Sequence, residues 1–342
     1  MNDFLFSLLS TPTVSGFEST GSQLFENYIG KYADDFYRDV VGNCIVKLCG
    51  SSSGTMMIEA HIDEIGFQVL HISDDGGIYI RANGGIDLQC LPGSQVEILG
   101  ANGIIQGVIG KTPIHLLSNQ ERDKSIELSN LWVDVGLSLD EIKKQVKIGD
   151  VVTIKPNAEL LGDYRISSKA LDDKIGVYIM TEAIKQLSNE RKSLTYNVYG
   201  VATVQEEVGY RGIKTVCSCL KPDIAISIDV DFATDVPDCP KTKYGDIRLG
   251  SGVIVSCCLD SDMSETKIIT TMAEKYNIPI QLSARPKATG GTNASRVRFA
   301  NDGIKTILLG IPCRYMHTPV EVCDMRDVEA AIKLIVEYVK NR

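Results

Sequence analysis

An interruption in an otherwise regular pattern most constrains the fold of this chain. Along most of its length, short β-branched runs alternate with segments of helical periodicity. From about residue 69 to residue 162 the pattern changes to short strand-like runs, separated by glycines and by Asn102-Gly103, a pair typical of β-hairpins. We therefore predict that a small β-barrel of residues 69–162 is inserted into a discontinuous α/β domain of residues 1–68 and 163–342.

Two kinds of segment predict the α/β domain. Segments with helical periodicity lie at 18–33, 173–188, 264–277 and 325–340. Apolar runs typical of buried strands lie at 55–60, 194–205, 224–230 and 304–311. Asp324 is expected to cap the last helix, and Ser138 with Glu141 forms a capping-box pattern that predicts one short helix within the insertion. Buried strands that alternate with amphipathic helices indicate a layered α/β core with a largely parallel sheet.

The composition excludes several classes of partner. The net charge of the 342 residues is −9, whereas nucleic-acid binding requires clustered Lys and Arg. No apolar run approaches the roughly 20 residues that cross a bilayer, and Asp3 stands where a secretory signal would be basic. The ten cysteines are dispersed without a disulfide framework. We therefore expect a cytoplasmic protein with reduced cysteines, and with neither nucleic acid nor a membrane as a partner.

Five residues of metal-ligand type lie at or near the ends of the predicted strands. They are His61, Asp172, Glu207, Asp229 and His317. Imidazole and carboxylate donors suit Zn²⁺, Co²⁺ or Mn²⁺, and a pair of such ions about 3.5–4 Å apart activates water for hydrolysis. The set therefore predicts a two-metal hydrolase.

The residues themselves leave some roles open. Asp63 lies two positions after His61, so in an extended chain it can accept the second ring N–H of that histidine, although a solvated strand end would look the same. Asp172 and Asp173 could each bridge two ions or merely cap the following helix. Asp231 and Asp235 follow Asp229 closely, which leaves the choice of acid ambiguous on chemistry alone.

Glu206-Glu207 is the most informative pair of acids. It follows the buried run that ends at Val204 and Gln205, where adjacent carboxylates are unfavourable without a compensating positive charge. Bound metal would supply that charge, with one glutamate as a ligand and its neighbour as a general base for water. A solvated strand end is the alternative.

Together, these segments resemble the family-forty-two metallopeptidases, the TET-type aminopeptidases, which include glutamyl and leucyl aminopeptidases and relatives labelled endoglucanases. The resemblance extends over essentially the whole chain. Its blocks, in order, are TPTVSGFE, AHIDEIGF, KALDDKIG, TVQEEVGYRG, AISIDVDFATDVP, ATGGTNAS and RYMHTPVEV. It implies a three-layer αβα metallopeptidase domain with a mixed sheet and an inserted barrel used in dimerisation, and many relatives assemble into hollow tetrahedral dodecamers.

The resemblance also implies a role for each site residue. Two divalent ions per subunit, Zn²⁺ first with Co²⁺ or Mn²⁺ as alternatives, would share five ligands: His61, Asp172 and Asp229 at one ion, and Asp172, Glu207 and His317 at the other. Asp172 would bridge the ions, Glu206 would be the general base, and Asp63 would orient His61. Two positions depart from the family pattern, because Asn293 replaces a usual Asp and removes a charge near the cleft, and Asp231 stands where many relatives have Thr.

We accordingly predict an aminopeptidase that removes the N-terminal residue from peptides with a free N-terminus. Glu206 would take a proton from a water held between the two metal ions, and the protein would form a homo-oligomer. One alternative is a metal-independent glycosidase, which needs two facing carboxylates, whereas Glu206 and Glu207 are neighbours and the chain has one Trp. The other is a catalytically silent metal-binding scaffold, which would be expected to lose Glu206 first.

Overall fold

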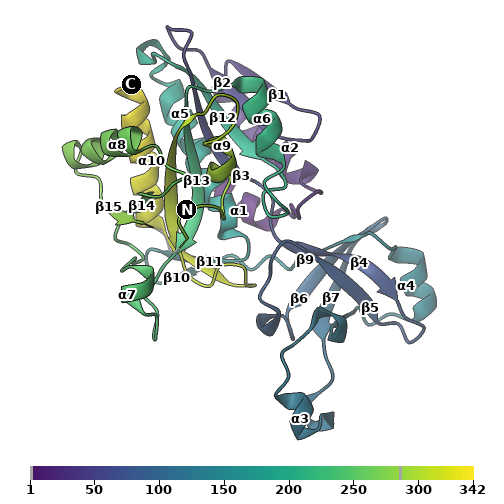
Figure 1. Cartoon of the computed structure of the whole chain (residues 1–342). Coiled ribbons are helices and arrows are strands. Elements are labelled where there is room, and N and C mark those ends of the chain that lie inside the picture. Colours follow the sequence, from purple (N-terminus) through teal and green to yellow (C-terminus); the bar gives the residue numbers. More distant parts are fainter. Residues whose placement is uncertain (1–2, 285–286) are drawn as a thin grey trace.

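A mixed eight-stranded sheet forms the centre of the larger domain in the computed structural model, which describes residues 3–284 and 287–342 (Figure 1). The strands in spatial order are β1 (Asp35–Arg38), β2 (Cys44–Leu48), β12 (Asn197–Thr203), β3 (Thr55–His61), β13 (Ile224–Phe232), β16 (Lys305–Cys313), β14 (Val253–Ser256) and β15 (Ile280–Ser283). The central strands β12, β3, β13 and β16 are mutually parallel, and β2 and β14 join them antiparallel. The predicted, largely parallel sheet is confirmed.

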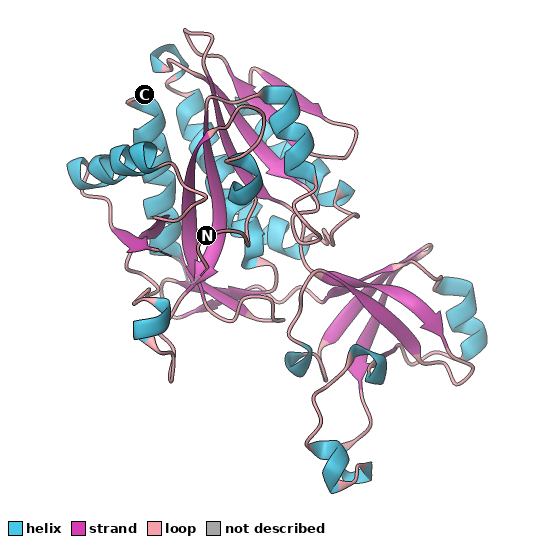
Figure 2. Ribbon diagram, viewed as in Figure 1, coloured by secondary structure: helices cyan, strands magenta, loops and turns pink. Residues whose placement is uncertain are grey.

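Helices cover both faces of this sheet (Figure 2). Apolar side chains of one face pack against α1 (Asp3–Ser10), α2 (Ser19–Ile29), α5 (Leu171–Ser188), α8 (Met263–Lys275) and α10 (Met325–Lys340). The other face packs against α6 (Gly212–Leu220) and α9 (Ala294–Val297). Asp324 caps α10 as predicted, because its side chain accepts the Arg326 N–H. The three-layer αβα architecture is therefore confirmed.

The insertion is a closed six-stranded barrel, as predicted. Its strands in spatial order are β4 (Gly66–Ile72), β5 (Ile78–Asn83), β8 (Trp132–Asp134), β7 (Gly103–Gly110), β6 (Gln95–Gly100) and β9 (Val151–Ile154). Strands β6 and β7 form the expected hairpin, and Ser138 caps the short helix α4 (Leu139–Gln145) in a capping box. A long excursion between β7 and β8 carries α3 (Asn119–Arg122) away from the barrel (Figure 1). The division of the chain at residues 69 and 162 stays a prediction, since β4 begins at Gly66.

A second, three-stranded sheet connects distant parts of the larger domain. It consists of β10 (Glu159–Leu161), β11 (Arg165–Ser168) and β17 (Glu321–Asp324), and pairs Ser168 with Glu321. Because β11 leads into α5 and β17 follows the loop after β16, this pairing holds the start of α5 beside that loop. A short helix, α7 (Lys241–Tyr244), lies between β13 and β14. No helix among the described residues has the length and apolar character to cross a lipid bilayer.

Candidate metal centre

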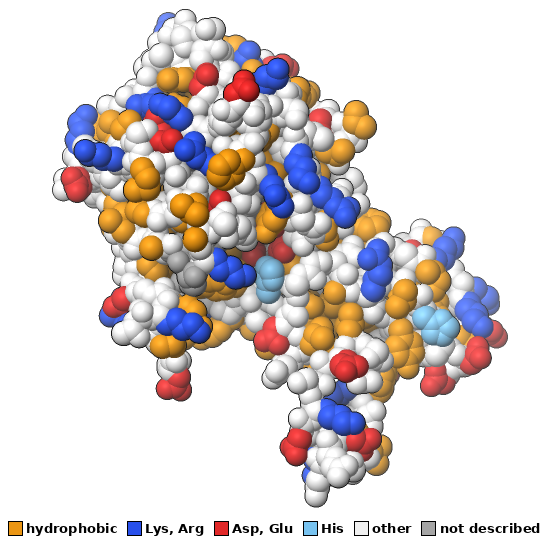
Figure 3. All heavy atoms as spheres, in the orientation of Figure 1, with side chains coloured by type: hydrophobic (Ala, Val, Ile, Leu, Met, Phe, Trp, Pro, Cys, Tyr) orange, Lys and Arg blue, Asp and Glu red, His pale blue; other side chains and the backbone are white. Residues whose placement is uncertain are grey.

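A cavity of about 690 Å³ opens at the carboxyl ends of the parallel strands. The space-filling view shows acidic side chains and a histidine in a hollow between the larger domain and the barrel (Figure 3). All five predicted ligands line this cavity, together with Glu206. Strand topology explains the convergence, because the carboxyl ends of β3, β12, β13 and β16 meet at one edge of the sheet.

Asp172 lies between the two histidines. Its Oδ1 is 3.1 Å from His61 Nε2, and its Oδ2 is 3.2 Å from His317 Nε2. The backbone of Asp172 and Asp173 is not helical, although both lie within the first turn of α5. Asp172 therefore presents one oxygen to each imidazole, the arrangement that a bridging ligand requires.

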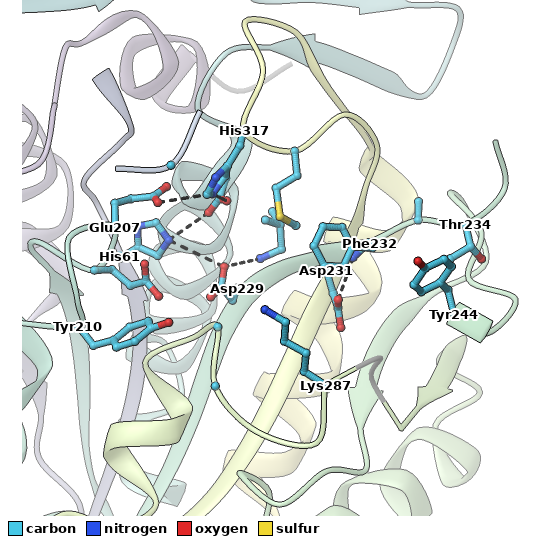
Figure 4. Close-up of a pocket in the computed structure, with 18 of the residues that line it drawn as sticks. His61, Glu207, Tyr210, Asp229, Asp231, Phe232, Thr234, Tyr244, Lys287 and His317 are labelled. Carbon is cyan, nitrogen blue, oxygen red and sulfur yellow. Dashed lines mark hydrogen bonds and ion pairs between the residues drawn. The ribbon is translucent and has the colours of Figure 1, made fainter. Parts of the chain in front are cut away.

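The remaining two acids each approach a different histidine (Figure 4). Asp229 Oδ1 lies 3.8 Å from His61 Nε2, and Glu207 Oε2 lies 3.4 Å from His317 Nε2. These distances divide the side chains into two groups that share Asp172, and the assignment of ligands to two ions stays a prediction. Ligand-type atoms of His61, Glu206 and Asp229 also lie within 4.8 Å of one another, so distance alone would admit Glu206 as a ligand.

Two carboxylate oxygens at the cavity have no hydrogen-bond donor among the described residues. They are Glu206 Oε1 and Glu207 Oε1, and both are buried. A buried, unpartnered carboxylate oxygen is costly unless a cation lies beside it. Imidazole and carboxylate donors in this number fit Zn²⁺, Co²⁺ or Mn²⁺. The residues present therefore fit divalent metal ions.

The pKa shifts of the residues at the cavity also indicate a site for a cation. Burial, and then repulsion from neighbouring carboxylates, raises the pKa of both Glu206 and Glu207 well above the usual range. Burial alone would lower the pKa of His61, but the surrounding acids, Glu206 first, raise it well above its ordinary value. Burial would raise the pKa of Asp172, but hydrogen bonds to the two histidines lower it. The protein alone thus leaves an excess of negative charge that a divalent cation would neutralise.

Asp63 contacts the backbone of Glu206 and Glu207 as well as the His61 ring. Its backbone carbonyl oxygen lies 3.1 Å from His61 Nδ1, nearer than its carboxylate, which lies 3.5 Å away. The carboxylate accepts the backbone N–H groups of Glu206 and Glu207 at 2.9 and 3.1 Å, and the Ser15 hydroxyl at 2.5 Å. Asp63 therefore positions the turn that carries both glutamates as well as the imidazole.

Two buried acids beside the predicted ligands make contacts that the sequence did not predict: Glu321, and Asp173, which the sequence offered only as a bridge between ions or a helix cap. Glu321 accepts the Asp172 N–H at 3.0 Å and the His317 N–H at 2.9 Å, and burial raises its pKa to about 8. Asp173 accepts the His61 N–H at 3.3 Å through Oδ2. The sequence indicates only that both acids lie close to predicted ligands, because Asp173 adjoins Asp172 and Glu321 lies within the RYMHTPVEV block with His317. Both orient backbone groups that carry ligands.

Asp231 and Asn293, the two departures from the family pattern, lie in different surroundings. Asp231 lines the cavity. Asn293 is buried and does not itself line the cavity, although Gly290 and Gly291 just before it do, so its effect on the charge near the cleft stays a prediction. Its Nδ2 donates to Glu59 Oε2 at 2.9 Å, so an Asp here would place two buried carboxylates against each other.

A comparison with protein families decides the relationship. The profile described as M42 glutamyl aminopeptidase matches residues 42–334, most of the chain. The chain belongs to the M42 peptidase family. The lysyl aminopeptidase of Pyrococcus furiosus is 32% identical to this chain over 336 residues, which covers 97% of this chain and 94% of the relative. This M42 member is accordingly a hydrolase that acts on peptides.

Solved structures agree with the M42 assignment. The TET aminopeptidase of Thaumarchaeota archaeon SCGC AB-539-E09 superimposes with a TM-score of 0.94 at 30% identity, over 99% of this chain and 95% of that one. The Pyrococcus horikoshii TET1 peptidase, which can assemble into a tetrahedron or a large octahedral shell, gives 0.87 at 34% identity, over 98% of both chains. A Thermotoga maritima protein described as an endoglucanase gives 0.79 at 29% identity, over 98% of this chain and 96% of that one.

Proposed function

We propose that this M42 member is an aminopeptidase that removes the N-terminal residue from peptides with the help of two divalent metal ions. The observation that carries the proposal is the placement of Asp172, whose two carboxylate oxygens lie 3.1 and 3.2 Å from different histidines. His61 and Asp229 would complete one site, and Glu207 and His317 the other. Bound Zn²⁺, Co²⁺ or Mn²⁺ would supply Lewis acidity, polarising the substrate carbonyl and lowering the pKa of water.

Glu206 is the residue that we assign to proton transfer. It is 7% exposed and lines the cavity, and its Oε1 has no hydrogen-bond partner among the described residues. The Asp63 carboxylate fixes the position of Glu206 through the backbone N–H. A carboxylate so placed can take a proton from the attacking water and deliver it to the leaving amine.

A glycosidase is the second candidate, and the Thermotoga maritima structure described as an endoglucanase is the observation in its favour. Such enzymes need two carboxylates about 5–9.5 Å apart on opposite sides of a sugar. Here Glu206 and Glu207 are adjacent, and each belongs to a cluster that contains His61. The geometry therefore favours metal-assisted hydrolysis. The silent-scaffold alternative loses its support with membership of a peptidase family.

Stripping and refilling the metal ions tests the proposed function. We expect EDTA-treated protein to lose activity on aminoacyl chromogenic substrates, and to regain it when Zn²⁺, Co²⁺ or Mn²⁺ is added singly, because the proposed reaction needs the bound ions. Four of the five residues that would hold them are buried or nearly so. N-acetylated substrates, which lack the free amine, are the matched control and should not be cleaved. Chelator-insensitive release of reducing sugar from a glucan, with no peptide cleavage, would contradict the proposal in favour of the glycosidase.

We also propose that the subunits form dimers through the barrel and assemble further into a dodecamer in the cytoplasm. Exposed apolar side chains of the inserted domain support the first step: Leu70, Ile104 and Val108 on barrel strands, and Ile114 and Leu116 in the excursion between β7 and β8. The shells formed by the Pyrococcus horikoshii TET1 peptidase support the second. The ten cysteines, all free, are consistent with a reducing compartment.

The mass in solution checks the assembly. We expect sedimentation velocity or native mass spectrometry to give a species many times heavier than the 37.4 kDa subunit. Leu116→Glu places a charge in the excursion between β7 and β8, at a side chain that is 76% exposed, and should shift the distribution towards smaller species. Lys31→Glu, on the larger domain, is the control. A wild-type protein that remains at the subunit mass at micromolar concentration would contradict the assembly.

A further inference from the structure

The side chain of Asn293 is used in an unusual way for its position. Asn293 directly precedes α9, where asparagine commonly caps a helix, but its side chain makes no capping hydrogen bond. Instead, Nδ2 donates to Glu59 Oε2 at 2.9 Å and to Thr203 Oγ1 at 3.0 Å. All three residues are buried. The Asn293 amide nitrogen therefore bonds side chains of the sheet and does not cap α9.

These two hydrogen bonds join three segments that build the cavity. Glu59 lies in β3 on the same side as His61, because residues two apart in a strand share a face. Thr203 is the last residue of β12, and in the parallel pairing of β12 with β3 it lies opposite His61. Asn293 itself follows the loop whose Gly290 and Gly291 line the cavity.

Other hydrogen bonds also hold this loop: the Leu259 N–H donates to the Ala288 carbonyl oxygen at 3.0 Å, and the Tyr210 hydroxyl is hydrogen-bonded to the backbone of Gly291. Asp260 accepts the Gly290 N–H at 2.7 Å and the Thr289 hydroxyl. This anchor holds the loop to the segment after β14, far along the sheet from β3. Asn293 ties the segment that follows Gly290 and Gly291, the glycine wall of the cavity, directly to β3 and β12, which Asp260 does not.

On the basis of the proposed function, we propose that Asn293 is a positioning residue that holds the Gly290–Gly291 wall of the substrate cavity in register with β3 and β12. The bond requires a donor at 293 and an acceptor at 59. An amide nitrogen supplies the donor, whereas a carboxylate would oppose Glu59 in a buried place. Substrate binding against the wall then depends on the chemistry of a residue that the substrate does not touch.

A four-variant cycle tests this inference on metal-loaded protein: wild type, Asn293→Asp, Glu59→Gln and the double variant. Asn293→Asp removes the donor, so kcat/KM is expected to fall at least about tenfold, mostly through KM, with metal content unchanged. In the Glu59→Gln background the same substitution should change kcat/KM less than about threefold, because the amide introduced at position 59 then donates to the acid at position 293. If Asn293→Asp lowers kcat/KM in the wild-type background but not beside Glu59→Gln, the effect comes from the hydrogen bond between the two positions and not from either residue alone.

The outcomes separate this inference from the function on which it rests. A wild type that cleaves no aminoacyl substrate contradicts the proposed function. If the wild type is active, an Asn293→Asp variant with unchanged kinetic constants overturns the inference alone. A loss of activity that follows loss of metal or of thermal stability, and that Glu59→Gln does not relieve, also overturns it, because Asn293 would then serve only the fold.

Discussion

Glu206→Gln is expected to lower kcat by about 10²–10⁴-fold while the protein keeps its full metal content. Glutamine has almost the same shape as glutamate, but it cannot accept a proton at neutral pH. The backbone N–H of residue 206 would still donate to Asp63, so the turn and the neighbouring Glu207 should stay in place. The loss should therefore fall on kcat and leave KM nearly unchanged, as expected for an interaction made in the transition state.

Glu207→Gln is the matched control, since it changes the adjacent acid in the same way. Glu207 Oε2 lies 3.4 Å from His317, in the group that would hold the second ion. We expect this variant to lose metal, measured by mass spectrometry of the desalted protein, with activity partly restored by excess Zn²⁺. If Glu206→Gln also released metal, Glu206 would be a ligand, as the distances within the cluster of His61, Glu206 and Asp229 allow.

The sequence predicted those parts of the fold that depend on local pattern. The β-branched runs that became β3, β12, β13 and β16 are apolar on both faces, because helices cover both sides of the sheet. The barrel was visible through its turns, because two-residue hairpins require particular residues. Strands β14 and β15 were not predicted, since four residues are too few to show a period.

The convergence of the candidate ligands on one cavity could be predicted for a topological reason. His61 ends β3 and Asp229 lies near the end of β13, and parallel strands bring such residues to one edge. The partners of buried acids could not be predicted. Nothing near Glu321 in the sequence indicates that it accepts the Asp172 N–H, because the pairing of β11 with β17 creates that contact. The same is true of Asn293 and Glu59, which lie 234 positions apart.

Glu64 is the clearest case of a charge whose role depends on distant residues. It directly follows Asp63 and is 1% exposed. Its Oε2 lies 2.5 Å from Lys169 Nζ and 3.0 Å from Lys174 Nζ, and both lysines are buried. Its Oε1 accepts the Thr13 N–H and, from β9 of the barrel, the Thr153 hydroxyl. This one carboxylate therefore connects the N-terminal segment, the barrel and the start of α5.

Glu64→Gln is expected to destabilise the protein by about 3–5 kcal/mol, because it leaves two buried ammonium groups without a counter-charge. Burial already lowers the pKa of Lys174 to about 7, so release of its proton would relieve part of this cost. Urea denaturation of metal-free protein measures the effect apart from metal release. Glu26→Gln is the control, since the Glu26–Arg38 pair is partly exposed and should contribute about 1 kcal/mol or less.

The destabilisation should also depend on pH in a definite direction. The two lysines lower the pKa of Glu64 to about 2, below its ordinary value of 4.5, despite the opposing effect of burial. A carboxylate with a lowered pKa contributes stability above the unfolded value and loses it as the pH falls through the folded value. The difference between wild type and Glu64→Gln should therefore be full at pH 7 and shrink from about pH 4.5 towards pH 2. A difference that stayed constant down to pH 2 would mean that the glutamate stabilises the fold by shape and hydrogen bonding, and not by charge.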